Sequence, residues 1–471
     1  MSGGGRPFEA WALPAGVPPA GGPSLEYETG GLRVRYPAAT PKWIGRIATL
    51  LGEARRGLLE RRAADVAAAL GRVGDRFLEV GDPLRAEALE LLPATSGLSA
   101  PMAAAVLDGM AADWRAERLQ TLLNAEMEGG APLDGFVLRD DGACRRLRAV
   151  GPRLCVQIVA GTVPGVGVTA LLRSLLVKGP TLLKPGRGDE VLPVLFARAL
   201  REEDAELADA AAVLYWPGGS EAVEEAALRE ADVVAAYGDD ATVSRLRGGT
   251  PVTARFVAYH HRLSLGVMGR GALDAKGVRR AASEVAGALA FFDQRGCVSP
   301  QVVYVVEGGE IDPRGFATLL AETLASLEGH LPGGVLDGLE ASTLHQLRGT
   351  TELLAASGSG VEIRHGGAAS WTVIWDPSPE FTPTCVGRVV RVKPVAHAAR
   401  VAELVAPYSA HLQTVAVAGL GGETEAVAEA LARVGVTRVT AFADVPFPPP
   451  WWHHDGLGPL GALVRWVDLD A

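Results

Sequence analysis

The residue with the clearest potential for covalent chemistry is Cys297, which lies in a segment punctuated by glycine and proline. The alanine-rich stretch 278–291 predicts a helix before it, and the apolar run 302–306 predicts a strand after it. Gly296 and Pro300 bracket the thiol and favour a loop. A loop on a rigid scaffold can aim a nucleophile, whereas most free cysteines are small buried hydrophobes. This segment alone leaves both interpretations open.

Composition and charge restrict the class of protein. The 471 residues, 48% hydrophobic and 21% charged, indicate a globular chain with two domains or one large composite fold. A net charge of −10 argues against a nucleic-acid partner. The first seven residues lack the charged and apolar regions of a secretion signal. The richest apolar run, 163–177, contains Arg173 and Ser174, so we expect no integral membrane segment and a cytoplasmic location.

Metal chemistry is not indicated by the cysteines and histidines. The four cysteines are scattered, without the paired spacing of metal ligands. Among the nine histidines, two adjacent pairs stand out, and neighbouring residues cannot easily face one ion. We therefore predict no metal site and free thiols in a reducing compartment.

The predicted elements indicate an α/β fold. Residues 1–43 form an arm rich in glycine and proline with one edge strand at 32–36, and helices are predicted at 44–70, 83–92 and 99–127, the last capped by Ser99. The stretch 136–150 alternates on both sides of Asp141-Gly142, which predicts a β-hairpin that packs on another part of the chain or on a second subunit.

Two series of apolar strands alternate with amphipathic helices, which predicts parallel sheets covered on both faces. Strands of the first series are predicted at 154–160, 181–184, 212–216, 233–237 and 255–258, with helices at 166–177, 190–201, 220–230 and 240–246. Strands of the second series are predicted at 302–306, 372–375, 388–392, 414–418, 437–441 and 463–467. Since such sheets bind ligands at the carboxyl ends of their strands, we expect a nucleotide pocket at the loops near Gly161, Pro185, Pro217 and Gly238.

Three loops carry candidate binding residues. The glycines of 161–167 either let backbone N–H groups approach a phosphate or form a sharp strand-to-helix turn. Lys184 ends a strand as a point charge for a ribose or phosphate, and Arg187 offers a fork for a phosphate monoester or lies in a solvated basic turn. In the loop 450–456, His453 and His454 are either proton donors or, for at least one of them, structural.

Taken together, these segments resemble the aldehyde dehydrogenase superfamily and, more narrowly, the fatty acyl-CoA reductase family of bacterial luminescence. The resemblance covers nearly everything from Phe136 onward. Its motifs include Val-Pro-Gly-x-Gly, Leu-Lys-Pro, Tyr-Gly-Asp-Asp-Ala, Asp-Gln-Arg-Gly-Cys-Val-Ser-Pro-Gln, Arg-Val-Lys-Pro-Val and Trp-His-His-Asp-Gly. The cysteine segment and the C-terminal motif are the most specific of these.

The resemblance assigns roles to individual residues. It makes Cys297 the nucleophile and places Lys184 against the adenosine ribose of the cofactor, with Gly218 and Gly238 lining the nucleotide cleft. Gly161, at the end of its strand, is a further candidate for cofactor binding. In relatives, a glutamate contacts the nicotinamide ribose, and the counterpart of that glutamate in this chain is Glu380. Many relatives that prefer NAD carry a glutamate three positions after the lysine, where this chain has Arg187. An arginine pairs with a 2′-phosphate, which predicts NADPH as the cofactor.

Two positions depart from the oxidising relatives. Their general-base glutamate corresponds to Ser264, 33 residues before the thiol, so activation of water is poorly supported. The asparagine that donates to the oxyanion is replaced by Thr162, a shorter donor, which leaves more of the oxyanion hole to the Cys297 N–H. Arg295 and loop N–H groups are expected to favour the thiolate.

These residues predict an NADPH-dependent reduction of a fatty acyl-CoA to its aldehyde through a thioester on Cys297. Alternatives on the same fold are aldehyde oxidation and acyl-phosphate reduction, and another is a non-catalytic nucleotide-binding scaffold. The acyl donor is either free acyl-CoA or a partner synthetase.

The order of the predicted elements, with a domain boundary near His261, gives the expected organisation. It consists of an arm (1–43), a cofactor domain (44–261) with the hairpin 136–150, a catalytic domain (262–445) and a C-terminal segment (446–471) that returns to the cofactor domain or the hairpin arm. By analogy, the hairpin makes a homodimer or homotetramer the expected assembly.

Overall fold

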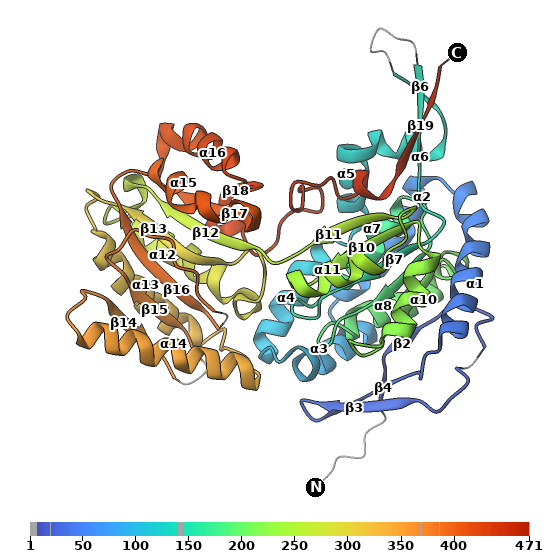
Figure 1. The fold of residues 1–471 in the computed structure, drawn as a ribbon, viewed down its shortest axis with the longest axis horizontal. Helices are drawn as coiled ribbons and strands as arrows, with labels where there is room; N and C mark the ends of the chain where they lie inside the picture. Colours follow the sequence, from blue (N-terminus) through green and yellow to red (C-terminus); the bar gives the residue numbers. More distant parts are fainter. Residues whose placement is uncertain (1–6, 19, 140–144, 368–369, 386, 471) are drawn as a thin grey trace. The chain divides into compact units, whose positions relative to one another are not determined.

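The computed structural model describes residues 7–18, 20–139, 145–367, 370–385 and 387–470 (Figure 1). The chain divides into two compact units. The first unit comprises Met1–Ser96, Leu107–His260 and Pro449–Ala471, and the second comprises Gly97–Val106 and His261–Pro448. A membrane-spanning helix needs about 20 apolar residues, and the described part of the chain contains none of that kind.

The first unit is built around a six-stranded sheet in the order β11-β10-β7-β8-β9-β2. All neighbouring strands are parallel except β2, which runs antiparallel to β9 at the edge. The bounds are β2 Trp11–Ala12, β7 Cys155–Ile158, β8 Thr181–Lys184, β9 Ala211–Leu214, β10 Val233–Tyr237 and β11 Arg255–Tyr259. Four-residue strands buried at every position, such as β8, explain why the sequence shows short apolar runs here instead of alternation.

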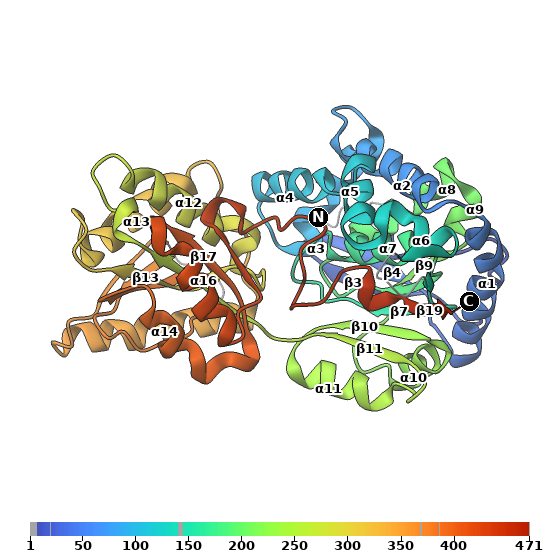
Figure 2. The same ribbon diagram turned by 90° about the horizontal axis from the view of Figure 1, so that it is seen from above.

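Helices cover both faces of this sheet. The helices α1, α10 and α11 share one apolar core with the sheet, and α7 and α8 lie over the opposite face (Figure 2). The helices of the first unit are α1 Pro41–Glu60, α2 Ala63–Leu78, α3 Pro83–Ser96, α5 Ala116–Met127, α6 Ala131–Asp134, α7 Val166–Leu176, α8 Val191–Glu203, α9 Ala205–Ala208, α10 Glu221–Glu230 and α11 Asp240–Gly249. A further helix, α4 Ala100–Ala112, begins in the residue range of the second unit.

Two helices predicted as continuous are broken. Within the stretch 44–70, α1 ends at Glu60 because Arg61 and Arg62 have an extended backbone. The Arg61 guanidinium pairs with the Asp204 carboxylate. The stretch 99–127 divides into α4 and α5 at Asp113, whose carboxylate pairs with Arg118. Ser99 caps α4 as predicted, since its Oγ accepts the N–H of Met102 at 3.3 Å.

Two small sheets complete the first unit. Near the N-terminus, β1 Phe8–Glu9, β4 Leu32–Tyr36 and β3 Leu25–Thr29 form a sheet in that order. The hairpin strands β5 Val137–Arg139 and β6 Arg145–Val150 pair antiparallel, and β19 Arg465–Leu469 adds to β6. The predicted Asp-Gly turn at 140–144 lies outside the described residues. The last strand, predicted in the second series, therefore belongs to this hairpin sheet.

The second unit contains a seven-stranded sheet in the order β14-β15-β16-β13-β12-β17-β18, parallel except for the edge strand β14. The strands are β12 Leu263–Met268, β13 Pro300–Val306, β14 Glu362–His365, β15 Thr372–Trp375, β16 Val389–Val395, β17 Leu412–Ala418 and β18 Arg438–Ala441. The helices are α12 Val278–Ala290, α13 Pro313–Glu328, α14 Gly338–Ala356, α15 Arg400–Val405 and α16 Thr424–Arg433. One core contains α15, α16 and the central strands.

The predicted α/β class is confirmed. The short strands β1, β2 and β3 of the first unit were missed, and so were two strands of the second unit, β12 and β14. The strand β12 is fully buried, but Ser264 and Gly266 interrupt its apolar run. The Cβ of a residue at 266 would lie 2.4 Å from the Phe442 ring, so close packing requires that glycine. The edge strand β14 carries Glu362 and Arg364 and lacks an apolar pattern.

Candidate functional site

The carboxyl ends of β10, β7, β8 and β9 lie side by side along one edge of the sheet in the first unit. Gly238 follows β10, Thr162 follows β7, Lys184 ends β8 and Gly218 follows β9. After β7 the chain places β8 and β9 on one side, then returns to place β10 and β11 on the other. Ligands of such sheets bind where the strand order reverses, here between β7 and β10.

Two of the three glycine N–H groups in the loop 161–167 are bonded within the protein, those of Gly165 and Gly167. The buried carboxylate of Asp189 accepts the N–H of Gly165 at 2.7 Å and that of Gly167 at 2.8 Å. Burial raises the pKa of Asp189 to about 8, while these two hydrogen bonds oppose the rise. The protein therefore satisfies the N-terminus of α7 with its own side chain. This favours the sharp turn over phosphate binding at Gly165 and Gly167, while the role of Gly161 toward a cofactor stays a prediction.

Gly161 has a packing reason of its own. A Cβ at this position would lie 2.0 Å from the carbonyl oxygen of Arg187, and one at Gly186 would lie 2.2 Å from the Gly161 nitrogen. The glycines thus let the β7 and β8 loops pack backbone to backbone. Thr162, one residue on, is exposed. It belongs to the first unit and Cys297 to the second, and its oxyanion role stays a prediction.

Lys184 is a buried cation at the end of β8. Burial lowers its pKa, and the nearby carboxylates of Glu224 and Glu190 oppose that change. Its Nζ lies 5.6 Å from the centre of the Tyr215 ring. The amine lies at the carboxyl edge of the sheet, where an anionic or hydroxylated ligand can accept its N–H groups.

Arg187 is exposed, but its guanidinium is held by the N-terminal sheet. It lies 4.6 Å from the centre of the Tyr27 ring and donates to the carbonyl oxygen of Glu28 at 3.3 Å. The Tyr27 hydroxyl donates to the buried carboxylate of Glu190, three residues further on. The partners of Arg187 come from residues about 160 positions earlier, so no local pattern in the sequence could identify them.

A nicotinamide nucleotide fits this edge. At Gly218 and Gly219 a Cβ would meet nothing within 4 Å, so the loop after β9 leaves open space beside the N-terminus of α10. Lys184 and Arg187 would hold the adenosine ribose and its phosphate, and the loop at Gly218 would adjoin the pyrophosphate. Gly238 has a further local role, since a Cβ there would lie 3.2 Å from Thr242.

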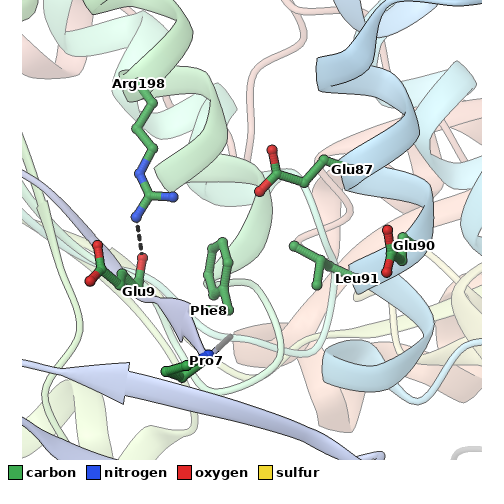
Figure 3. A pocket seen from close by; sticks show the side chains of 7 residues that line it. All are labelled: Pro7, Phe8, Glu9, Glu87, Glu90, Leu91 and Arg198. Atoms are coloured by element: carbon green, nitrogen blue, oxygen red, sulfur yellow. Dashed lines mark hydrogen bonds between the residues drawn. The ribbon is translucent and has the colours of Figure 1, made fainter. Parts of the chain in front are cut away.

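A separate pocket of the first unit lies between β1, α3 and α8 (Figure 3). Glu87 and Glu90 of α3 line it together with Phe8 and Arg198, and the Arg198 guanidinium donates to the carbonyl oxygen of Glu9 at 2.6 Å. None of the candidate residues lines this pocket.

In the second unit, Cys297 lies at the tip of a turn before β13. The N–H of Ser299 donates to the carbonyl oxygen of Gly296 at 3.0 Å, which closes a turn around the exposed thiol. The other cysteines that the structure describes differ, because burial raises the pKa of Cys155 to about 12 and also raises that of Cys385. Cys144 lies outside the described residues. Among the described cysteines, accessibility favours Cys297 as the nucleophile.

Ser264 lies under this turn, on β12. Its side chain is fully buried, its hydroxyl donates to the carbonyl oxygen of Cys297 at 2.7 Å, and its Oγ accepts the N–H of Thr414 at 3.2 Å. Both contacts are to the backbone, so Ser264 positions the cysteine and is no candidate for a base.

We expect Ser264→Ala to lower the rate of Cys297 acylation about tenfold, because it removes the hydrogen bond that positions the nucleophile. The loss in unfolding free energy should be about 1 kcal/mol. Stopped-flow acylation and urea unfolding measure the two effects. A matched control is Thr351→Val, which removes a buried hydroxyl bonded within α14. Wild-type acylation by Ser264→Ala would contradict the positioning role.

The residues before the thiol have an unusual backbone. Phe292, Asp293 and Gln294 have φ values of 56°, 50° and 63°, the left-handed region that side chains disfavour. Each costs on the order of 1–3 kcal/mol, so surrounding contacts must impose this conformation. Arg388 also has a positive φ, 58°.

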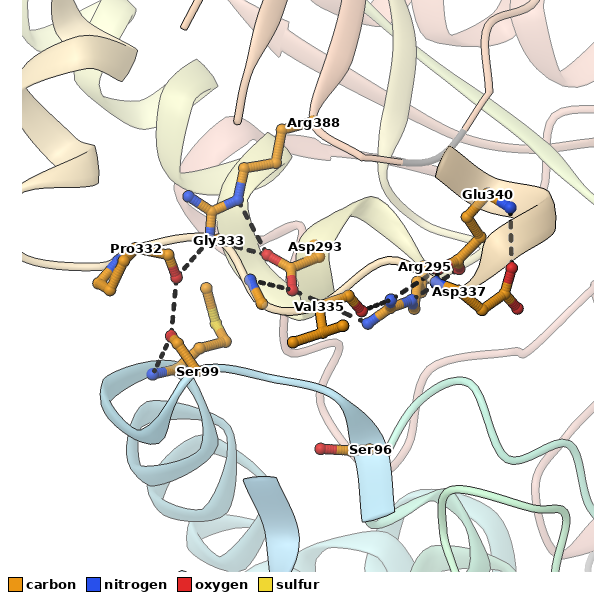
Figure 4. A network of polar contacts seen from close by, with 12 residues as sticks. Ser96, Ser99, Asp293, Arg295, Pro332, Gly333, Val335, Asp337, Glu340 and Arg388 are labelled. Carbon is orange, nitrogen blue, oxygen red and sulfur yellow. Dashed lines mark hydrogen bonds and ion pairs between the residues drawn. The ribbon is translucent and has the colours of Figure 1, made fainter. Parts of the chain in front are cut away.

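A buried ion pair supplies these contacts (Figure 4). The Asp293 and Arg388 side chains are 3% and 2% exposed, and the Arg388 Nε donates to Asp293 Oδ1 at 3.0 Å. The other Asp293 oxygen accepts the N–H of Gly334 at 3.1 Å. The amide of Gln294 donates to the carbonyl oxygen of Val389 at 2.6 Å and accepts its N–H at 2.6 Å. The strained turn is thereby fixed to β16.

The predicted electrostatic role of Arg295 is not the one found. Its guanidinium makes two hydrogen bonds of 2.9 Å to the Glu340 carboxylate and a third to the Val335 carbonyl oxygen. A cation neutralised in this way anchors the loop. Arg438 on β18 is a cation that interacts electrostatically with Cys297. Burial lowers the pKa of Arg438 to about 10, against the opposing influence of Asp444 and Cys297. Arg438 is thus still charged at neutral pH and favours the thiolate.

Glu380 is exposed on the connection between β15 and β16. This connection is held at two points. The buried Lys393 donates to the Asp376 carboxylate at 2.5 Å and to the carbonyl oxygen of Ser378 at 2.9 Å. Further on, the N–H of Thr384 donates to the Gln301 side chain at 3.1 Å, beside the first residue of β13. The role of Glu380 toward a nicotinamide ribose stays a prediction.

The two C-terminal histidines differ in environment. The His454 ring stacks at 4.4 Å on Tyr259 and at 4.7 Å on Trp452, and it is mostly buried. His453 is 66% exposed, with its Nε2 3.5 Å from the Glu126 carboxylate. The packing of His454 among aromatic rings favours the structural interpretation for this member of the pair.

Comparison with known proteins agrees with this arrangement. The family described as acyl-CoA reductase (LuxC) matches residues 59–466. A long-chain acyl-protein thioester reductase from Aliivibrio fischeri is 27% identical over 354 residues, covering 74% of this chain and 70% of that protein. Methylmalonate-semialdehyde dehydrogenase (DddC) from Oceanimonas doudoroffii superposes with a TM-score of 0.75 at 16% identity, covering 98% of each chain. The NADP-dependent glyceraldehyde-3-phosphate dehydrogenase from Bacillus halodurans C-125, complexed with NADP, gives a TM-score of 0.72 at 13% identity over 95% of this chain and 96% of that one.

The chain has the aldehyde dehydrogenase fold. Each of its two units contains a mostly parallel sheet, and Cys297 lies in a turn of the second unit. The chain belongs to the acyl-CoA reductase (LuxC) family. It is accordingly an oxidoreductase that acts on acyl thioesters, and the resemblance inferred from the sequence is confirmed.

Proposed function

We propose that the chain reduces a fatty acyl-CoA to its aldehyde with NADPH, through an acyl group carried on Cys297. The observation that carries the proposal is the exposed thiol of Cys297 in a turn whose backbone is held by Ser264, which donates to the Cys297 carbonyl oxygen. By the resemblance, Ser264 occupies the position of the hydrolytic base. A nucleophile without a neighbouring carboxylate at that position suits exchange between thioesters better than release of an acid.

In the first half-reaction, the Cys297 thiolate attacks the thioester carbonyl and the carbon–sulfur bond to CoA breaks. The departing thiolate takes up a proton, and a new thioester on Cys297 remains. Arg438 favours the thiolate, and the Cys297 N–H and Thr162 are the proposed oxyanion donors.

A bound nicotinamide nucleotide supplies the hydride for the second half-reaction. Lys184, Arg187 and the loop at Gly218 would hold its adenosine half, and Glu380 would contact its nicotinamide ribose. When the aldehyde forms, Cys297 leaves the carbonyl carbon as a thiolate and is regenerated. The proposed assembly is a homodimer or homotetramer formed through the sheet of β5, β6 and β19.

The test is oxidation of NADPH and of NADH with acyl-CoAs of increasing chain length, with the aldehyde identified by mass spectrometry. We expect aldehyde in proportion to nucleotide consumed, and NADPH preferred. Free acid as product, or turnover only with acyl phosphate, would contradict the proposal. Nucleotide binding without turnover of any acyl donor would favour a scaffold.

A second candidate concerns the acyl donor. The relative from Aliivibrio fischeri is named an acyl-protein thioester reductase, which favours an acyl group delivered on a partner synthetase. Repeating the assay with an acylated protein donor in place of acyl-CoA separates the two. A higher kcat/KM with the acylated protein than with acyl-CoA would identify the protein as the preferred acyl donor.

A further inference from the structure

Three tyrosines border the carboxyl end of β8. Tyr27 comes from β3, Tyr36 from β4 and Tyr215 from the end of β9. The centre of the Tyr215 ring lies 5.5 Å from that of Tyr27 and 5.1 Å from that of Tyr36. The N-terminal sheet therefore contributes to the edge at which Lys184 and Arg187 lie.

Tyr27 contacts both charged groups that flank this edge. Its ring supports the Arg187 guanidinium at 4.6 Å, and its hydroxyl donates to the Glu190 carboxylate. A guanidinium stacked by its face keeps its N–H groups directed outward in its plane, where phosphate oxygens can accept them in pairs. The Glu28 carbonyl oxygen fixes one of these N–H groups.

Glu190 would otherwise oppose an anionic ligand. Its carboxylate is fully buried and close enough to Lys184 for the two to interact electrostatically. One oxygen accepts the Tyr27 hydroxyl and the other accepts the N–H of Gly188 at 2.7 Å. Burial raises the pKa of Glu190, and the hydrogen bonds from Tyr27 and Gly188 oppose that rise. A carboxylate tied down on both oxygens repels a neighbouring phosphate less than a free one.

We propose that Tyr27 is a positioning residue that determines cofactor specificity: it presents Arg187 to a 2′-phosphate and holds the Glu190 carboxylate away from it. The inference rests on the proposed use of NADPH. It assigns a role at the nucleotide edge to the N-terminal segment, outside the residues that the family match covers.

Calorimetric titration of the full chain with NADPH, NADH, 2′,5′-ADP and 5′-AMP tests this role without catalysis. In Tyr27→Ala we expect the ratio of NADPH to NADH affinity to fall roughly three- to tenfold, the loss of one cation–π support. Tyr27→Phe keeps the ring and should lower the ratio about threefold by releasing Glu190. NADH affinity should stay within about twofold, and 2′,5′-ADP should follow NADPH.

Two further variants complete the experiment. Arg187→Ala should abolish the preference for NADPH, and Tyr36→Phe, a change in the same aromatic group, should leave both affinities unaltered. If Arg187→Ala loses the preference while neither Tyr27 variant does, the inference is overturned and the cofactor proposal stands. If the wild-type chain does not prefer NADPH, both the role of Tyr27 and the proposed use of NADPH are overturned. Should Tyr27→Ala not fold, Tyr27→Phe decides alone.

Discussion

Replacement of Cys297 by alanine is expected to reduce aldehyde formation by roughly 10⁴-fold or more, since removing an attacking nucleophile costs rates of that order. The acyl group then has no acceptor, while Lys184 and the loop at Gly218 are unaltered, so nucleotide affinity should persist. Intact-protein mass spectrometry after incubation with acyl-CoA should show an acyl adduct on the wild-type chain and none on Cys297→Ala.

Cys385→Ala is the matched control for this experiment. Cys385 lies in the same unit, but it is half-buried and burial raises its pKa, so its thiolate is disfavoured. This variant should keep both the adduct and the turnover. If the acyl adduct persisted in Cys297→Ala and disappeared in Cys385→Ala, the nucleophile would be Cys385 and not Cys297.

The second large effect is expected at the ion pair that holds the strained turn. Asp293→Ala removes the nearest carboxylate from the buried Arg388 guanidinium and leaves Glu328 at 3.6 Å, so we expect a loss of about 3 kcal/mol of unfolding free energy, the low end for breaking a buried ion pair. Because the same carboxylate accepts the Gly334 N–H, the turn before Cys297 should also lose its fixed conformation. Urea unfolding and the rate of thiol alkylation report the two effects.

Asp312→Ala provides a control of the same chemical change. Asp312 caps α13 and accepts the N–H of Gly315 at 2.6 Å at an exposed position, so its loss should cost only about 1 kcal/mol. Equal losses of stability in the two variants would show that the pair at Asp293 and Arg388 does not hold the turn.

The sequence predicted those features that depend on neighbouring residues. Strands such as β8 and β10 are short apolar runs between turn residues, and Gly296 and Pro300 placed Cys297 on its loop. The strand β12 was not predicted because Ser264 and Gly266 break its apolar pattern. Both residues make contacts with segments far along the chain.

The supports of the candidate site could not be predicted. Asp293 and Arg388 are separated by 95 residues, and Tyr27 and Glu190 by 163 residues. Their pairing depends on which strands become neighbours, and no local pattern encodes that. The sequence left the role of the glycines in the loop 161–167 open for the same reason, because the carboxylate that accepts the N–H groups of Gly165 and Gly167 belongs to Asp189, more than 20 residues later.

Ser264 has a consequence for the timing of the proposed cycle. A carboxylate at this position would let water compete for the acyl group, and the fate of each acyl-enzyme would depend on which arrived first, water or reductant. With a hydroxyl committed to two backbone partners, that competition is weakened. An acylated chain can then persist while reductant is scarce and store the acyl group as a loaded intermediate. Each acyl group taken up would be conserved for reduction and protected from loss as free acid.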